Sequence, residues 1–170
     1  MSESRKSLWA PWRMEYIAGI ENSADGCFLC RAIANPQDDE ENYVLWRSAD
    51  TLALLNRFPY TSGHVLIAPV AHVPEPEDLP DTILLALMQR TRDVKRTLQT
   101  ALAAQGFNIG INLGRCAGAG LPGHLHVHVV PRWNGDTNFM AVLGDVKVIP
   151  QSLAEVRRLF LAAAQSLGLP

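Results

Sequence analysis

The stretch "GHLHVHVVPRW", residues 123–133, places a histidine at every second position with one apolar residue between neighbours. Successive side chains of a β-strand point to opposite faces, so His124, His126 and His128 are predicted to share one face, about 6.5–7 Å apart. The β-branched content favours a strand, whereas a helix would scatter the three imidazoles. The apolar spacers, predicted to enter the core on the other face, are Leu125, Val127 and Val129.

Length, composition and charge set the class of protein. The chain has 170 residues, 48% of them hydrophobic and 19% charged, with a net charge of −2, which predicts one globular domain over residues 1–170. We expect residues 1–7 to be disordered. The charge argues against a nucleic-acid partner, and the longest apolar run in a helical context is too short to cross a membrane. Three cysteines, two of them in a Cys-x-x-Cys, favour the reducing cytoplasm.

The chain alternates between strand and helix signals. We predict a hairpin from residues 51–56 and 64–69, a long helix over residues 81–104 that Gly106 ends, and a strand over residues 107–113. A short helix over residues 26–36 and a C-terminal helix with a Ser152–Glu155 capping box and a Gly168 stop complete the chain. The sum is an α+β fold: a mostly antiparallel sheet, one long helix and a C-terminal helix.

A row of three imidazoles on one face suits nucleophilic chemistry. Neutral imidazole is a nucleophile near pH 7 when a hydrogen bond fixes its other nitrogen. A second imidazole can donate to an oxyanion or protonate a leaving group, and a phosphorus centre suits both tasks. Two other interpretations stay open at this point: an exposed polar face of an edge strand, and a zinc site that uses all three histidines.

The segment "HLHVHVV" (124–130) resembles the signature of the histidine triad, or HIT, family at every position. "LALLNRFPYTSGHVLIAP" (52–69) looks like the strand–turn–strand of that family. "LWAPWRMEYI" (8–17), "GFNIGINLG" (106–114) and "PRWNGDTNFM" (131–140) resemble the bacterial-type branch that includes dinucleoside polyphosphate phosphorylases and hydrolases. The resemblance covers nearly the whole chain and implies a HIT-like fold, usually in a homodimer.

The resemblance also implies roles for individual residues. His126 would attack the α-phosphorus of a nucleotide and carry the nucleotidyl group, and His128 would contact phosphate oxygens and assist the leaving group. Asn56 would lie near the ribose, or simply form a turn at the strand end, and Asn112 would reach the phosphates. The expected activity is cleavage of dinucleoside polyphosphates or related phosphoanhydrides and phosphoramidates. The alternative is a nucleotide-binding sensor or scaffold with little activity.

One loop departs from the family pattern. Many family members carry a glutamine shortly before the triad, whereas residues 114–123 read "GRCAGAGLPG". Backbone N–H groups at Gly118 and Gly120 could form an anion nest there, with added charge from Arg115. The other interpretation is a flexible connection between two strands.

The spacing of Cys27 and Cys30 is that of zinc sites, which need two further ligands. Some triad proteins hold a structural zinc with two cysteines and two histidines, the first triad histidine among them. This resemblance implies a Zn²⁺ site made by Cys27, Cys30, His72 and His124. A redox Cys-x-x-Cys and two buried thiols are the competing interpretations.

The enzymatic interpretation depends on one structural expectation. The imidazole of His126 should face open solvent space on a strand, next to the position of a bound phosphoryl group. His64 is expected to be structural.

Overall fold

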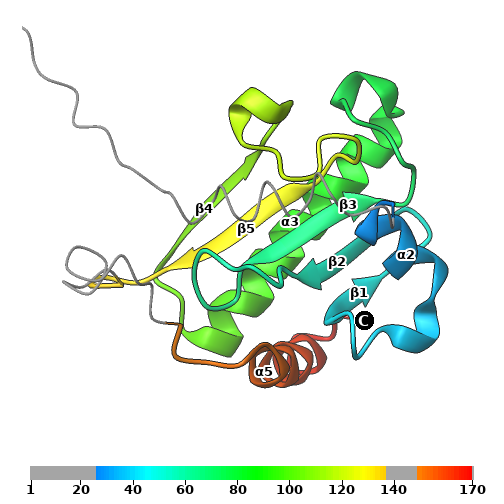
Figure 1. Ribbon diagram of the computed structural model, residues 1–170. Helices are drawn as coiled ribbons and strands as arrows, with labels where there is room; N and C mark the ends of the chain where they lie inside the picture. The colour runs from blue at the N-terminus through cyan, green and yellow to red at the C-terminus, as the bar shows by residue number, and fades with distance from the viewer. Residues whose placement is uncertain (1–25, 137–148, 170) are drawn as a thin grey trace, which may run out of the picture.

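A five-stranded sheet forms the centre of the molecule. The computed structural model describes residues 26–136 and 149–169. The strands are β1 (Val44–Arg47), β2 (Thr51–Leu55), β3 (Val65–Pro69), β4 (Gly106–Ile111) and β5 (Val127–Arg132). Their order is β1-β2-β3-β5-β4, and every pairing is antiparallel (Figure 1). The α+β prediction with an antiparallel sheet is confirmed.

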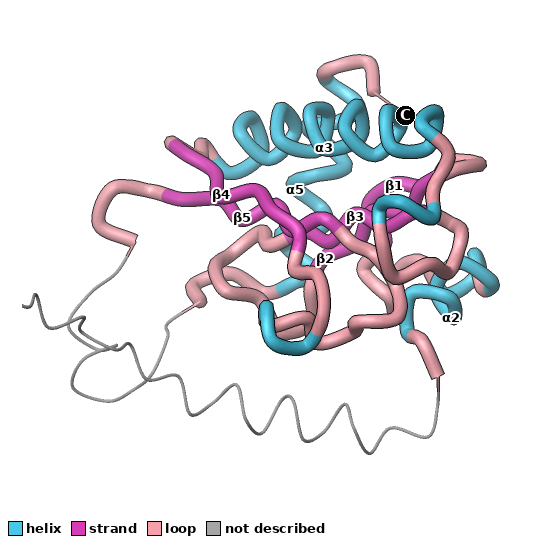
Figure 2. Tube along the Cα trace, turned by 90° about the horizontal axis from the view of Figure 1, so that it is seen from above, coloured by secondary structure: helices cyan, strands magenta, loops and turns pink. Residues whose placement is uncertain are grey.

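Two helices cover one face of the sheet and a third lies on the other face. Helices α3 (Asp81–Leu102) and α5 (Leu153–Ser166) pack together on the first face, and α2 (Phe28–Ala34) lies with the connecting loops on the second (Figure 2). Short 3₁₀ turns are η1 (Pro36–Asp38), η2 (Pro76–Asp78) and η3 (Arg115–Ala117). Val127 and Val129 of β5 join the core under α3 and α5. Because side chains alternate along a strand, His128 is on the opposite face.

The predicted hairpin is present, and its turn positions His64. β2 and β3 pair from Thr51–Pro69 to Leu55–Val65, and the Asn56 N–H donates to the His64 carbonyl at 2.8 Å just beyond them. Gly63 has φ +77°, a conformation that glycine adopts readily. The turn therefore delivers His64 to the start of β3, next to β5.

The structure corrects three sequence predictions about the elements. β1 was not anticipated, because it has four residues and a register shift between Val44 and Trp46 that breaks the alternation. Met88, which its helical spacing from Leu84 and Thr91 predicts to lie on the apolar stripe of the long helix, is 60% exposed. Gly106 does not end that helix.

The end of α3 shows why the glycine rule failed. The helix ends at Leu102, and Ala103 takes the left-handed conformation with φ +50°. The indole N–H of Trp133 lies 3.2 Å from the carbonyl oxygen of Leu102 and 3.1 Å from that of Ala103. A side chain from after β5 therefore caps the helix, and Gly106 is free to open β4. At α5, the Ser152 cap and the Gly168 stop are confirmed, since Ser152 Oγ accepts from the Glu155 N–H and Gly168 has φ +65°.

One further prediction, disorder over residues 1–7, lies outside the described residues. No helix in the part of the chain that the structure describes is long and apolar enough to cross a membrane.

Candidate active site

Only the last of the three alternating histidines lies in a regular strand. β5 begins at Val127, so His124 and His126 occupy the extended segment before it. There, the Leu125 N–H donates to the Val73 carbonyl at 2.7 Å, so this segment is bonded to the loop after β3. The prediction of one strand through all three histidines is therefore wrong at its start. The burial of the three apolar spacers is confirmed.

The His126 ring has a fixed tautomer. Its Nδ1 lies 2.8 Å from the carbonyl oxygen of His124. A carbonyl oxygen only accepts, so Nδ1 carries the proton and Nε2 presents a lone pair. Nε2 has no hydrogen-bond partner among the described residues, and every fully buried side-chain nitrogen or oxygen among them has one. The Nε2 edge therefore keeps contact with solvent.

The enclosure of this ring differs from the sequence expectation. His126 is only 7% exposed, so the prediction that its ring faces open solvent is wrong for all but the Nε2 edge. Burial lowers the pKa of the His126 imidazole below its usual value; the hydrogen bond to the His124 carbonyl opposes this shift, and the charge of the His124 ring adds to it. The ring is therefore neutral at pH 7, as a nucleophile must be.

His64 fixes the tautomer of His128. The Tyr60 N–H donates to Nδ1 of His64 at 3.1 Å, so the proton of His64 is on Nε2. That Nε2–H lies 3.0 Å from Nδ1 of His128, which must accept, and this leaves the proton of His128 on its own Nε2. His64 is fully buried. It was expected to be structural, and its contacts show that it orients a triad ring.

A cleft of about 360 Å³ opens beside His128. The side-chain amide of Asn112 lies 3.5 Å from Nε2 of His128; because that nitrogen carries a proton, the amide oxygen is the partner that fits. The ring centroids of His126 and His128 are 4.9 Å apart, so the two imidazoles are neighbours. The lining residues are Tyr60, Thr61, Asn108, Ile109, Gly110, Asn112, His128, Val130 and Arg132.

The predicted site residues are thus only partly brought together. His128 and Asn112 line the cleft, whereas His126 is not among the lining residues, although its ring neighbours that of His128. Asn56 does not line it: its Oδ1 accepts from the Phe58 N–H at 2.9 Å, and its Nδ2 lies 3.3 Å from Nδ1 of His64. These are the contacts of a turn former. Contact with a ribose stays a prediction.

Sequence reasoning did not find Tyr60 and Thr61 as cleft residues. The Tyr60 ring lies 4.6 Å from the His64 ring and 6.1 Å from the His128 ring, centroid to centroid. Their position in "RFPYTSGH", just before the buried His64, is the one signal that could have pointed to them.

Three successive N–H groups of the glycine-rich loop are used internally. The N–H groups of Ala117 and Ala119 donate to the Gly114 carbonyl, and that of Gly118 donates to the Arg115 carbonyl. These three donors therefore close the η3 turn instead of forming an anion nest.

The four predicted metal ligands converge on one point. Each of Cys27, Cys30, His72 and His124 offers one ligand atom, and these atoms all lie within 4.8 Å of one another. Nδ1 of His124 is 3.2 Å from Sγ of Cys27 and 3.5 Å from Sγ of Cys30, and Nδ1 of His72 is 3.1 Å from Sγ of Cys30. Two sulfurs and two imidazole nitrogens are the donor set of a closed tetrahedral zinc site.

The protonation states of His124, Cys27 and Cys30 suit the binding of a divalent metal ion. Nε2 of His124 is 2.9 Å from the Pro69 carbonyl oxygen, so it carries the proton and Nδ1 points its lone pair at the sulfurs. Burial raises the pKa of the Cys27 thiol, but its interactions with the His124 ring and the Cys30 N–H outweigh it and bring the pKa to about 6. Burial and the neighbouring Cys27 raise the pKa of Cys30 to about 11. A bound dication would relieve the repulsion between two thiolates.

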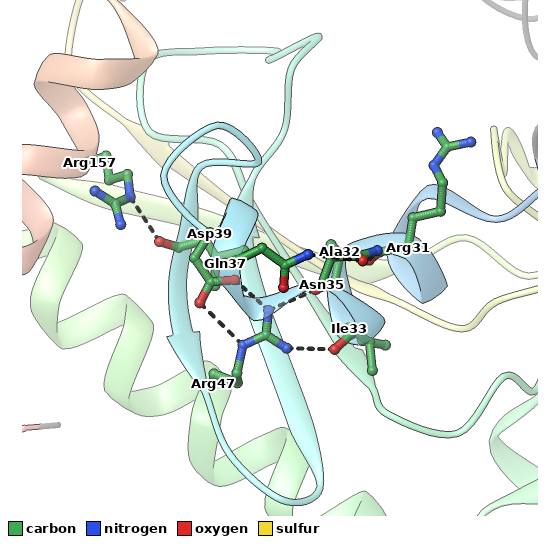
Figure 3. A network of polar contacts seen from close by, with 9 residues as sticks. Arg31, Ala32, Ile33, Asn35, Gln37, Asp39, Arg47 and Arg157 are labelled. Atoms are coloured by element: carbon green, nitrogen blue, oxygen red, sulfur yellow. Dashed lines mark hydrogen bonds and ion pairs between the residues drawn. The ribbon is translucent and has the colours of Figure 1, made fainter.

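Arg47 holds the helix that carries the cysteines. Its guanidinium donates to the carbonyls of Ala32 (2.7 Å) and Ile33 (2.9 Å) near the end of α2, and it pairs with Asp39 (Figure 3). These carbonyls have no partner inside a helix, so a cation here is favourable. β1, in the sheet, thus fixes the position of α2 and of its two thiols.

The HIT domain family model matches residues 37–135, more than half of the chain. The chain belongs to the HIT domain family. It is 42% identical over 161 residues to the AP-4-A phosphorylase of Mycobacterium tuberculosis strain H37Rv, covering 89% of this chain and 80% of that protein. It is also 37% identical over 93 residues to the bis(5'-nucleosyl)-tetraphosphatase [asymmetrical] of Schizosaccharomyces pombe, which covers 55% of this chain and 50% of that protein.

Solved HIT structures share the fold. A zinc-bound histidine triad family protein from Mycobacterium smegmatis superposes with a TM-score of 0.69 at 28% identity, covering 84% of this HIT chain and 96% of that one. The histidine triad nucleotide-binding protein ST2152 from Sulfolobus tokodaii superposes with a TM-score of 0.67 at 24% identity, covering 83% and 93%. The predicted family and fold are confirmed.

Proposed function

We propose that this HIT chain cleaves dinucleoside polyphosphates through a nucleotidyl group carried on His126. The fixed tautomers of the two neighbouring rings are the main support: Nε2 of His126 offers a lone pair, and Nε2 of His128 offers a proton at the cleft. The likeness to an AP-4-A phosphorylase and to a bis(5'-nucleosyl)-tetraphosphatase supports this substrate class.

In the first step, the Nε2 lone pair of His126 attacks the α-phosphorus and an N–P bond forms as the bridging P–O bond breaks. The departing nucleotide keeps the electron pair of that bond and takes the proton from Nε2 of His128. In the second step, water or orthophosphate attacks the phosphorus and its proton returns to His128. The N–P bond breaks, and the lone pair returns to His126.

Two asparagines complete the proposed site. Asn112 would donate to the phosphate oxygens from the cleft wall, 3.5 Å from His128. Asn56 would contact the ribose while it holds the turn before His64.

The acceptor is phosphate in the version of the reaction that we favour, because the 42% identical relative is named a phosphorylase. With diadenosine tetraphosphate as substrate, phosphorolysis yields ADP and ATP, whereas hydrolysis yields AMP and ATP. Product analysis with and without orthophosphate therefore separates the two.

The decisive kinetic variant is His126→Ala. Turnover should fall by about 1000-fold or more, because a covalent nucleophile is removed, while nucleotide binding and zinc content persist. Cys116→Ser, which changes an exposed thiol outside the site, serves as the control and should turn over normally. Undiminished turnover in His126→Ala would contradict the mechanism. Nucleotide binding without any turnover in the wild type would point to a sensor instead.

We also propose that Cys27, Cys30, His72 and His124 hold a structural Zn²⁺ ion. The donor set and the fixed lone pair of His124 support this, as does the zinc-bound M. smegmatis neighbour. When bound, the ion would tie the loop after β3 and helix α2 to the segment before β5. Metal analysis should find one zinc per chain, lost in Cys27→Ser and kept in His126→Ala.

A homodimer is the assembly that we propose. β4 pairs only with β5 among the described residues, so its outer edge is available to a second copy. Ile109, Ile111 and Leu113 are 46%, 41% and 39% exposed along it. Ile111→Lys should shift the protein to monomers in light scattering, while Leu85→Lys, at an exposed site on α3, should not. A monomeric wild type would contradict the assembly.

We further propose a cytoplasmic location, without a membrane or nucleic-acid partner. The cysteines Cys27, Cys30 and Cys116 are all free thiols, which fits a reducing compartment.

A further inference from the structure

A short chain of contacts joins the two thiols of the metal cluster to the imidazole of His126. Sγ of Cys27 and Sγ of Cys30 lie 3.2 and 3.5 Å from Nδ1 of His124. The carbonyl oxygen of the same His124 lies 2.8 Å from Nδ1 of His126 and fixes its tautomer. One residue therefore serves the cluster through its ring and the nucleophile through its backbone.

The two thiols are also placed to react with each other. Cys27 is the N-cap of α2 and Cys30 lies in the first turn, so that Sγ of Cys27 accepts from the Cys30 N–H at 3.4 Å. Their sulfurs are within 4.8 Å of one another, and both residues are partly exposed. A disulfide needs an S–S separation of about 2.05 Å, a distance that side-chain rotation of neighbouring cysteines on one turn can close.

We propose that Cys27 and Cys30 form a peroxide-sensitive dithiol site whose oxidation expels the metal and disengages the nucleophile. The proposal rests on the zinc site and the role of His126 proposed above. It combines the metal and redox interpretations of the Cys-x-x-Cys: the reduced pair of thiols binds the metal, and the oxidised pair is a disulfide without it.

The oxidation balances with hydrogen peroxide as the oxidant. One thiolate attacks a peroxide oxygen, the O–O bond breaks, and a sulfenic acid and hydroxide form. The second thiolate attacks that sulfur, the S–S bond forms, and a second hydroxide leaves. The two sulfurs lose two electrons, the peroxide gains them, and two protons convert the hydroxides to water. A Zn²⁺ ion held by Cys27, Cys30, His72 and His124 would thereby lose its two thiolate ligands and would leave the site.

The consequence for His126 is displacement without unfolding. The bond of the His124 ring to the Pro69 carbonyl and that of the Leu125 N–H to Val73 do not involve the thiols, so we expect both to survive oxidation. The ring loses both thiolate contacts, so the carbonyl that holds His126 Nδ1–H is less well fixed. The loss of such an outer support reduces metal affinity or activity by about 10- to 100-fold in comparable sites, and we expect a fall in turnover of that size.

The experiment uses the full-length, zinc-loaded Cys116→Ser chain, whose only thiols are Cys27 and Cys30, since the protein has three cysteines. Hydrogen peroxide is added in steps, and four quantities are followed at each step. These are the zinc released to a coloured chelator, the free thiols, dinucleotide turnover, and the ¹⁵N-labelled Nδ1–H signal of His126. We expect loss of two thiols, release of one zinc, loss of the Nδ1–H signal and the fall in turnover to coincide. A dithiol reductant plus Zn²⁺ should reverse all four.

Two results would overturn the proposal. One is a disulfide between Cys27 and Cys30 with zinc still bound, and the other is a disulfide form with full turnover and an unchanged His126 signal.

The outcomes keep this proposal apart from the proposed function. His126→Ala should still lose its two thiols and release zinc to peroxide, although it lacks turnover. If the reduced protein holds no zinc, the metal assignment is wrong, and the thiol, turnover and His126 readouts still test the switch. If the wild type lacks turnover, the catalytic proposal is wrong. Zinc release and the His126 signal then still decide whether oxidation of Cys27 and Cys30 expels the metal and displaces His126.

Discussion

At the scale of single residues, hydrogen bonds assign one tautomer to each of four histidines. His124 donates from Nε2 to Pro69, and His126 donates from Nδ1 to the His124 carbonyl. His64 donates from Nε2 to His128. The alternating pattern singled out the triad histidines, but it did not predict these tautomers. The acceptors for His124 and His64 are distant in sequence, and the acceptor for His126 is a backbone carbonyl, which a side-chain pattern does not show. Nor did the pattern predict the burial of His126.

The lowered pKa of His126 predicts a pH profile. Only the unprotonated ring can attack phosphorus, so turnover is lost as pH falls through the pKa of this ring. Burial lowers that pKa below the usual value of 6.5, and activity should therefore persist below pH 6.5 before it declines. The acidic limb of kcat/KM against pH reports the free-enzyme value. A midpoint above 6.5 would contradict the neutral, buried nucleophile.

His64→Phe tests the tautomer relay. Phenylalanine keeps a ring next to Tyr60 but cannot donate to His128, so the proton of His128 is no longer confined to the nitrogen at the cleft. We expect kcat to fall by about 100-fold, the lower range for the loss of a positioned general acid. KM should change little. A Tm near that of the wild type would separate this effect from unfolding, and unchanged kcat would show that the relay is not needed.

At the scale of elements, propensity and periodicity correctly predicted those helices, strands and caps that residues close in sequence determine. The β2–β3 hairpin, the body of α3 and the Ser152 cap of α5 all follow from nearby residues. The failures have distant causes: Trp133 ends α3 from after β5, and the partner strand β2 gives β1 its bulged pairing. The four residues of the proposed metal cluster were predicted together through the family resemblance, whereas spacing alone indicated only the two cysteines.

Gly63→Ala should destabilise the turn that delivers His64. A Cβ at Gly63 would lie 2.5 Å from Cδ1 of Leu102 and 3.3 Å from Cγ of Pro131, and φ there is +77°. Strain and overpacking together should cost about 2–5 kcal/mol. Gly135→Ala is the matched control, because φ is +78° but nothing lies within 4 Å, and about 1–2 kcal/mol is expected from strain alone. Equal losses in denaturant unfolding would show that the contacts with Leu102 and Pro131 do not matter.

Arg47→Met should weaken metal binding from outside the cluster. The change removes the donors that hold the carbonyls of Ala32 and Ile33, so α2 and its thiols are less well positioned. We expect zinc affinity to fall by about 10- to 100-fold in a chelator competition. Arg57→Met provides the control, since Arg57 donates to Glu41 and Asn42 without touching α2. If both variants bind zinc equally well, β1 does not support the site.

At the scale of the whole molecule, the sheet order brings the site together. β3 and β5 are neighbours although the whole of α3 and β4 lies between them in sequence, and this places His64 against His128. The fold class could be predicted from the sequence. The strand order could not, because long-range pairing leaves no local signal. The same order leaves β4 at the edge next to the cleft.

The central claim is that His126 carries the nucleotidyl group. Brief mixing with labelled diadenosine tetraphosphate, a rapid quench in base and peptide mass spectrometry would detect the phosphoramidate. The account predicts an acid-labile, base-stable nucleotidyl adduct on the peptide that contains His126, absent from His126→Ala. An adduct on His128, on His124 or on a cysteine, or rapid turnover with no adduct at any quench time, would contradict it.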